Sequence, residues 1–164
     1  MKRLLLIPLI LIFAAGCGTN AVDESVTVDL HLSGEMLFEG SNTLQMTAET
    51  NLPEIAKKLS VDEANLKKIG VAEATLSMNV DEARITESVL LQVVSNNQGL
   101  ITVGTLSPLV DPDALRLNVA EDIDLMPYLA DEGCTWVLDL NLSEDYLDEM
   151  SVGGTLTLRV EYSK

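Results

Sequence analysis

Apolar and polar residues alternate along most of this chain. Residues 26–32 carry apolar side chains at even positions and polar ones at odd positions, and residues 72–80 and 134–142 largely repeat the pattern. A period of two is typical of β-strands that bury one face and expose the other. The chain should therefore fold mainly from antiparallel strands with their apolar faces packed together.

Turn signals divide the alternating stretches into about eight strands. Gly40-Ser41-Asn42 and Asn96-Asn97-Gln98-Gly99 are typical of turns. The sequence thus predicts an all-β, mainly antiparallel β-sandwich in a single domain over residues 26–164. The strand expected at 85–94 is apolar on both faces, so it should lie centrally with a cover on its second face.

One helical insertion is expected among the strands, at about residues 53–69. Its apolar side chains fall on one face, as one helix or two short ones: Ile55, Leu59, Leu66 and Ile69. Ser60 and Glu63 have the spacing of a capping box, and Gly70 follows where a C-terminal cap favours glycine. The helix is the obvious cover for the strand at 85–94. A further helical turn is expected at 126–129.

The first residues have the three parts of a secretory signal. Positive charges at residues 2–3 precede an apolar run at 4–13, and small residues at 14–16 lead to Cys17. The apolar run is too short to span a bilayer, which takes about 18 residues or more. The sequence predicts that residues 1–16 are a signal peptide.

Ala14-Ala15-Gly16-Cys17 resembles the lipobox of bacterial lipoproteins. The resemblance implies cleavage before Cys17, a diacylglycerol thioether on its sulfur, and usually an acyl chain such as palmitate on its new amino group. Residues 17–25 would then be a lipidated tether, stably held because two or three acyl chains bind a bilayer durably. A lipobox followed by alternating strands is similar to many uncharacterised lipoproteins, with no specific family indicated.

That resemblance also implies a location. A lipid-anchored protein belongs to the cell envelope, and Gly18 is not the aspartate that often retains lipoproteins in the inner membrane. The outer membrane is therefore expected if the host is Gram-negative. The same small residues also fit an ordinary secretory signal, cut at the same bond without a lipid.

Acidic residues greatly outnumber basic ones in this chain, 26 against 10, and the formal net charge is −16. Loss of Lys2 and Arg3 with the signal would leave 8 basic residues. So negative a surface argues against nucleic acid as a partner and against charge-driven adsorption to anionic lipid. It is compatible with divalent cations.

Carboxylates in loops are the metal candidates. Asp111 and Asp113 flank a proline, Asp122 and Asp124 lie in a second acidic loop, and a third acidic cluster spans 144–149. Calcium ligands are often gathered in such loops, although none of these matches the twelve-residue calcium loop. Solvated acidic loops are the alternative, and no cofactor is predicted.

The chain offers little for catalysis. His31, the single histidine, is expected on the outer face of the first strand, and Cys134 is expected to point into the core. One histidine and one unlipidated cysteine do not support a zinc site or a cysteine–histidine pair. No catalytic residue is predicted, and the protein is not expected to be an enzyme.

Two functions fit these observations. The first is a lipid-anchored, non-catalytic β-sandwich that binds or scaffolds other envelope components. The second is a periplasmic carrier of lipid or another apolar ligand, with sheet and helix enclosing a cavity. The two functions are distinguished by purifying the protein without its anchor, because a carrier should copurify with lipid and a binding module should not.

Overall fold

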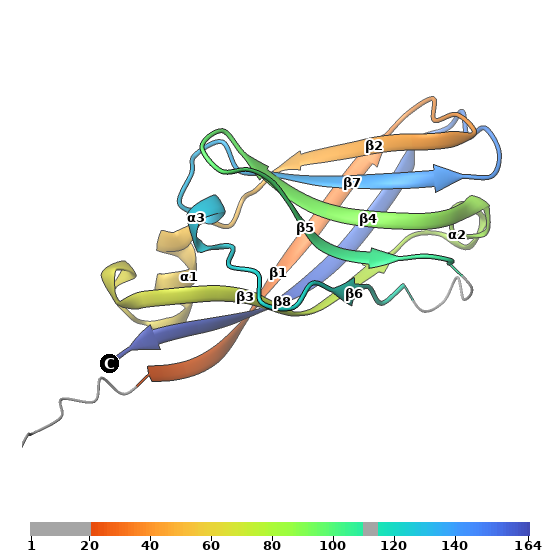
Figure 1. The fold of residues 1–164 in the computed structure, drawn as a ribbon. Coiled ribbons are helices and arrows are strands. Elements are labelled where there is room, and N and C mark those ends of the chain that lie inside the picture. Colours follow the sequence, from red (N-terminus) through yellow and green to blue (C-terminus); the bar gives the residue numbers. More distant parts are fainter. Residues whose placement is uncertain (1–20, 110–114) are drawn as a thin grey trace, which may run out of the picture.

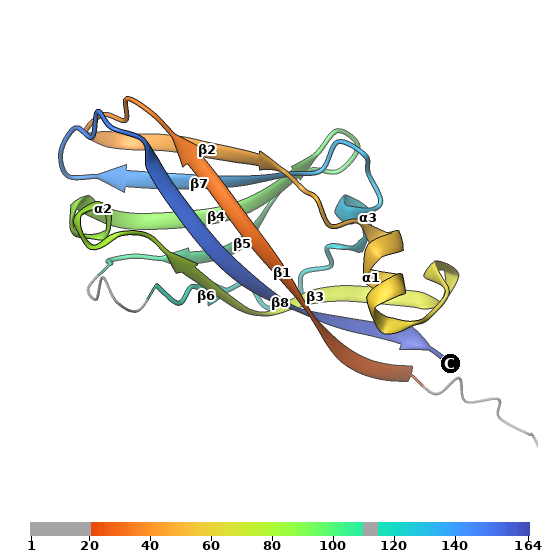
Figure 2. The same cartoon turned by 180° about the vertical axis from the view of Figure 1, so that it is seen from behind.

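The computed structural model describes residues 21–109 and 115–164, which form two antiparallel β-sheets (Figures 1 and 2). One sheet has the order β1-β8-β3, with β1 at Ala21–Gly34, β3 at Leu66–Ser77 and β8 at Met150–Ser163. The other has the order β2-β7-β4-β5-β6, with β2 at Gly40–Thr47, β4 at Thr86–Ser95, β5 at Gly99–Leu106, β6 at Asn118–Val119 and β7 at Thr135–Leu142. The predicted all-β sandwich is confirmed.

Several sequence predictions fall on residues that the structure does not describe. The signal peptide at 1–16 and the lipidation residue Cys17 lie outside the described residues, and so do Asp111 and Asp113. The described chain begins with β1 at Ala21, so residues 21–25, predicted as the end of a tether, are the first part of a strand.

The longest pairing in the protein joins β1 to β8. It runs from Ala21 opposite Ser163 to Gly34 opposite Met150, and β3 pairs with the other edge of β8. The alternating residues of β1 face the second sheet, and their side chains are buried: Val26, Val28, Leu30 and Leu32. The predicted alternation is therefore confirmed for β1, because its apolar residues lie on one face and that face is buried in the core.

Large side chains fill the space between the two sheets. The largest that are almost fully buried include Trp136, Tyr162, Leu138, Ile69 and Leu91. The Tyr162 hydroxyl, at the edge of this core, donates a hydrogen bond of 2.8 Å to the Glu24 carboxylate. That bond raises the pKa of Tyr162, because it favours the protonated phenol.

The predicted helix over 53–69 is wrong in its second half. Helix α1 spans Leu52–Leu59 and ends at Ser60, whose φ of 58° is left-handed and whose N–H bonds to the carbonyls of Ala56 and Lys57. A short 3₁₀ turn at Glu63–Asn65 follows, and Leu66 begins β3. Ser60 is thus the C-cap of α1 rather than the start of a capping box. No second helix can follow, because the residues from Leu66 onward pair with β8 as a strand.

Helix α1 also covers a different part of the sandwich from the one predicted. Its apolar residues Leu52, Ile55 and Ala56 join the core, and the Lys58 ammonium donates to the carbonyl of Thr27 in β1 at 3.0 Å. The helix therefore closes one end of the sandwich beside β1. The second face of β4 is left at the surface, where Leu90 and Val94 are half-buried by their neighbours.

The strands give the molecule two distinct ends (Figures 1 and 2). We call the end where β1 begins and β8 ends the terminal end. It also carries α1 and α3. Helix α3 spans Met126–Leu129 and is the helical turn that the sequence predicted. The opposite end, the distal end, carries the β1–β2 connection (35–39), helix α2 at Val80–Ile85 and the β7–β8 connection (143–149).

Candidate functional site at the distal end

Two connections far apart in the chain are bonded to each other at the distal end. The amide of Leu37 donates to the carbonyl of Tyr146 at 2.9 Å, and the amide of Tyr146 donates to the carbonyl of Leu37 at 2.8 Å. Next to this bridge, the amide of Glu39 donates to the Asp145 carboxylate at 2.8 Å. These bonds fix the β1–β2 and β7–β8 connections as one unit.

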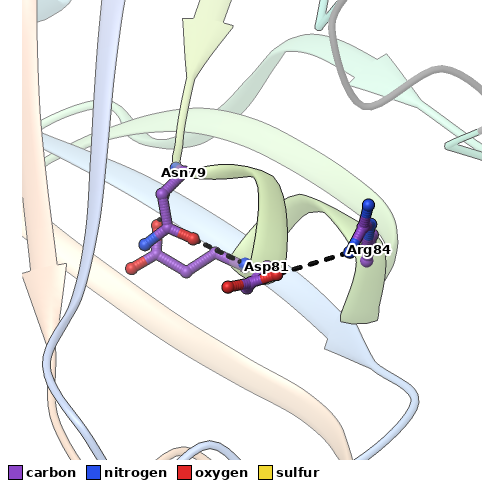
Figure 3. A network of polar contacts seen from close by, with 4 residues as sticks. Asn79, Asp81 and Arg84 are labelled. Carbon is purple, nitrogen blue, oxygen red and sulfur yellow. Dashed lines mark hydrogen bonds and ion pairs between the residues drawn. The ribbon is translucent and has the colours of Figure 1, made fainter.

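The third element of this end is α2, a helix that the sequence analysis did not predict. Asn79 caps the helix: its side-chain oxygen accepts from the amide of Glu82 at 2.8 Å, and a Glu82 oxygen accepts from the amide of Asn79 at 3.0 Å (Figure 3). This is a complete capping box. The Asp81–Arg84 ion pair on the same helix is exposed at 3.5 Å and contributes little to stability.

Glu82 links α2 to the β7–β8 connection and to the start of β8. Its side chain is 2% exposed, and its second oxygen accepts long bonds of 3.4 Å from the Tyr146 hydroxyl and from the amide of Ser151 at the start of β8. A buried carboxylate costs free energy unless donors surround it, and here three donors do. Glu82 and the Leu37–Tyr146 bridge thus hold three connections together.

Large apolar side chains are exposed on these connections. Met36 is 63% exposed, Phe38 55% and Leu147 66%, while Val80, at the start of α2, is 48% exposed. Within the described residues a fifth exposed side chain of this kind belongs to Leu100, the second residue of β5. The β4–β5 hairpin that carries it lies at the terminal end, on the same side as α3 (Figure 1). A single exposed apolar residue is ordinary, but several on bonded connections mark a candidate interaction surface. We call Met36, Phe38, Leu147 and Val80 the distal apolar cluster.

The sequence did not reveal this cluster, because the alternation of residues 26–32, continued through Met36 and Phe38, would place both side chains in the core. The strand ends at Gly34, and Met36 has a φ of 55°, which reverses the alternation. Leu37 is consequently the buried residue, 7% exposed, and its two neighbours face outward. The available signal was apolar residues flanked by acids, as in Glu35-Met36-Leu37-Phe38-Glu39.

Carboxylates flank the exposed apolar residues of the two bonded connections along the sequence. The two bonded connections carry six acidic residues and no basic one: Glu35, Glu39, Glu144, Asp145, Asp148 and Glu149. We call these six residues the acidic rim. Six basic residues lie on elements of the terminal end, where acids such as Glu54 and Glu161 accompany them: Lys57, Lys58, Lys67, Lys68, Arg159 and Lys164. The distal end carries Arg84 on α2, so the two bonded connections are distinguished by carrying acids alone.

The remaining predicted site residues are not brought together with this surface. Asp124 accepts bonds from the amides of Ile69 (3.1 Å) and Met126 (3.0 Å), so its carboxylate joins β3 to α3. Asp122 sits in a turn with a φ of 59°, and His31 is exposed on the outer face of β1. Among the described residues no three His, Cys, Asp or Glu side chains are arranged to hold a metal ion.

Cys134 lies in the core, as the sequence predicted, and is 4% exposed. Burial, with a smaller effect from the charge of Asp131, raises the pKa of the Cys134 thiol from 9.0 to about 11. At about pH 8 the reactive thiolate should therefore be roughly a hundredfold scarcer than in an ordinary cysteine.

We expect the Cys134 thiol to be inert in the folded protein. In a Cys17→Ser variant, where Cys134 is the single remaining cysteine, Ellman's reagent should react fully in denaturant and at least about a hundredfold more slowly without it. A native rate close to the denatured one would mean that Cys134 is accessible. The free thiol of glutathione, measured alongside, calibrates the reagent.

Comparisons with known proteins add no functional information. No protein-family model and no curated protein sequence matches the chain. Among solved structures, it is similar to one described as desmodium yellow mottle tymovirus, with 10% identity and a TM-score of 0.34, covering 100% of this chain and 89% of that one. Another, described as turnip yellow mosaic virus, has 10% identity and a TM-score of 0.27, covering 86% and 96%. Both TM-scores are too low to bear on function.

Proposed function

We propose that this protein is a lipid-anchored, non-catalytic binding module of the cell envelope, tethered through Cys17. The proposal combines the lipobox resemblance with the position of β1. Ala21, the first residue of β1, follows Cys17 by four residues, which span about 14 Å at most. An acylated Cys17 would therefore hold the terminal end near the bilayer surface and direct the distal end away from it.

The observation that carries the proposal is the placement of the bonded connections at the end opposite β1's start. Binding residues are commonly carried on connections that a rigid scaffold positions, and the β-sandwich is such a scaffold. The acidic rim fits the same orientation, because it would face away from anionic headgroups. No helix in the described part of the chain is long and apolar enough to cross a membrane.

The hydrogen bonds of the buried carboxylate support the non-catalytic part of the proposal. Glu82 is the buried acid among the described residues, and both of its oxygens accept structural hydrogen bonds. A catalytic carboxylate usually lies in a cleft, where an oxygen is free to reach a substrate. Glu82 instead supports the fold.

The second candidate, a carrier of lipid or another apolar ligand, has less support. The space between the sheets is filled, as Trp136 and Leu138 show with exposures of 1% and 0%. The clefts found lie at the surface, such as one of about 340 Å³ beside Lys68, Gly70 and Arg159. Lipid that copurifies in stoichiometric amount with the Cys17→Ser variant would reverse this preference.

The anchor is tested by metabolic labelling with palmitate in the native host. We expect wild type to incorporate the label and Cys17→Ser to lose it completely, while Cys134→Ser, the matched control, keeps it. Labelling is the readout because an uncleaved signal can itself hold the variant in a membrane. An unlabelled wild-type protein would contradict the lipid anchor and favour the ordinary secretory signal.

A further inference from the structure

We propose that the distal end docks on a protein partner whose apolar pocket is edged with lysine or arginine side chains. This inference deepens the proposed function, on which it rests, by naming the surface that binds and the chemistry of what it binds. The distal apolar cluster would fill the pocket, and the acidic rim would meet the basic edge.

The distal apolar cluster is suited to fill a pocket because its side chains are exposed on backbone that is already held in place. Met36 and Phe38 flank Leu37, and Leu147 follows Tyr146, so three of its members adjoin the bonded pair. A backbone that is ordered before binding sacrifices less conformational entropy than a flexible one. Phenylalanine offers a large apolar area, and methionine adapts its shape to a partner.

The backbone at Met36 adds to the argument, because packing of its own side chain repays little of its strain. Its φ of 55° is a conformation that glycine or asparagine adopts at lower cost than methionine. The side chain is 63% exposed, so little packing within the protein repays that cost. Strain of this kind is concentrated at ligand-binding surfaces, where another molecule supplies the missing contacts.

The acidic rim determines which partner fits. Anionic lipid and nucleic acid would be repelled, and two copies meeting through this end would bring like charges together. A protein with lysine or arginine around an apolar pocket complements both parts of the surface. Opposite charges also accelerate encounter, and salt weakens that effect.

The test is photo-crosslinking in intact cells of the native host, using the full chain with benzoylphenylalanine at position 38. The matched control carries the same group at position 100, because Phe38 and Leu100 are 55% and 54% exposed but lie at opposite ends. We expect one protein adduct from position 38 that position 100 does not give. Mass spectrometry of the adduct should locate the contact beside an apolar pocket with lysine or arginine at its edge.

Surface variants then test the recognised chemistry. Glu35→Lys with Glu144→Lys should reduce the adduct about tenfold or more, and Met36→Ser with Leu147→Ser should do the same. Glu121→Lys with Glu132→Lys changes charge equally at exposed positions outside the rim and should leave the adduct unchanged. Thermal unfolding of each purified variant verifies that the fold is retained.

Several results would overturn the inference. In the crosslinking experiment these are equal adducts from positions 38 and 100, no adduct, an adduct with lipid, or an adduct that contains two copies of this chain. Among the variants, it is an adduct whose amount does not change when Glu35→Lys and Glu144→Lys reverse the charge of the rim. Palmitate labelling is scored separately. A labelled protein without the adduct refutes the docking surface alone, whereas a specific adduct on an unlabelled protein refutes the lipid anchor alone.

Discussion

The Glu82→Leu variant is expected to lose about 2–4 kcal/mol of unfolding free energy, because leucine leaves buried donors without an acceptor. The amides of Asn79 and Ser151 and the hydroxyl of Tyr146 all donate to this carboxylate. The variant should also weaken α2, since the capping box loses one of its two bonds. Urea unfolding followed by the fluorescence of Trp136, the single and buried tryptophan, measures the loss.

Three control variants separate the Glu82 carboxylate from general effects of substitution. Glu82→Gln keeps an acceptor oxygen and should lose less, about 1–2 kcal/mol, while Tyr146→Phe removes one long bond and should lose about 1 kcal/mol or less. Asp81→Leu changes a neighbouring acid that is exposed, so its effect should stay within about 0.5 kcal/mol. Wild-type stability in Glu82→Leu would contradict the role of Glu82 in holding the distal end together.

The two capping boxes show how far local sequence predicts this fold. Ser60 with Glu63 and Asn79 with Glu82 have the same spacing, yet the first was predicted and the second forms. The residues after the first box pair with β8 as part of β3, and that long-range pairing overrides the local helical pattern. Nothing within either four-residue stretch reveals that difference.

The half-buried strands were predictable for a simple physical reason. Along residues 26–33 of β1, buried and exposed residues alternate strictly, so alternation in the sequence maps directly onto the two faces. The second face of β4 was misjudged because its apolar residues are sheltered by neighbouring strands rather than by α1. The sequence of β4 does not show whether its second face is covered by a helix or sheltered by the side chains of neighbouring strands.

The candidate site was the least predictable part of the molecule. It depends on the bond between Glu39 and Asp145, which are 106 residues apart, and on the bridge between Leu37 and Tyr146. The acids at 144–149 were singled out in the sequence only as possible metal ligands. Their position around exposed apolar side chains emerges from tertiary contacts, which a single sequence does not contain.

Gly153 and Gly154 lie inside β8, the central strand of the first sheet, although paired glycines are more typical of turns and loops. Gly154 pairs with Leu30 on one side and Leu76 on the other, at positions that face the core. A glycine within a strand often marks a close approach of neighbouring groups. A Cβ atom at position 154 would lie 2.8 Å from a Leu76 methyl carbon and 3.2 Å from the Thr75 carbonyl oxygen.

Gly154→Val is therefore expected to lower the free energy of unfolding by about 2–4 kcal/mol, because valine overfills a packed site and must displace Leu76 and the β3 backbone. Thr155→Val is the matched control: it places the same side chain one residue further along β8 on the exposed face, and its effect should stay within about 0.5 kcal/mol. Urea unfolding compares the two variants under identical conditions. If Gly154→Val and Thr155→Val were equally stable, β3 would move aside without loss of unfolding free energy. The close contact between β8 and β3 would then not require glycine at position 154.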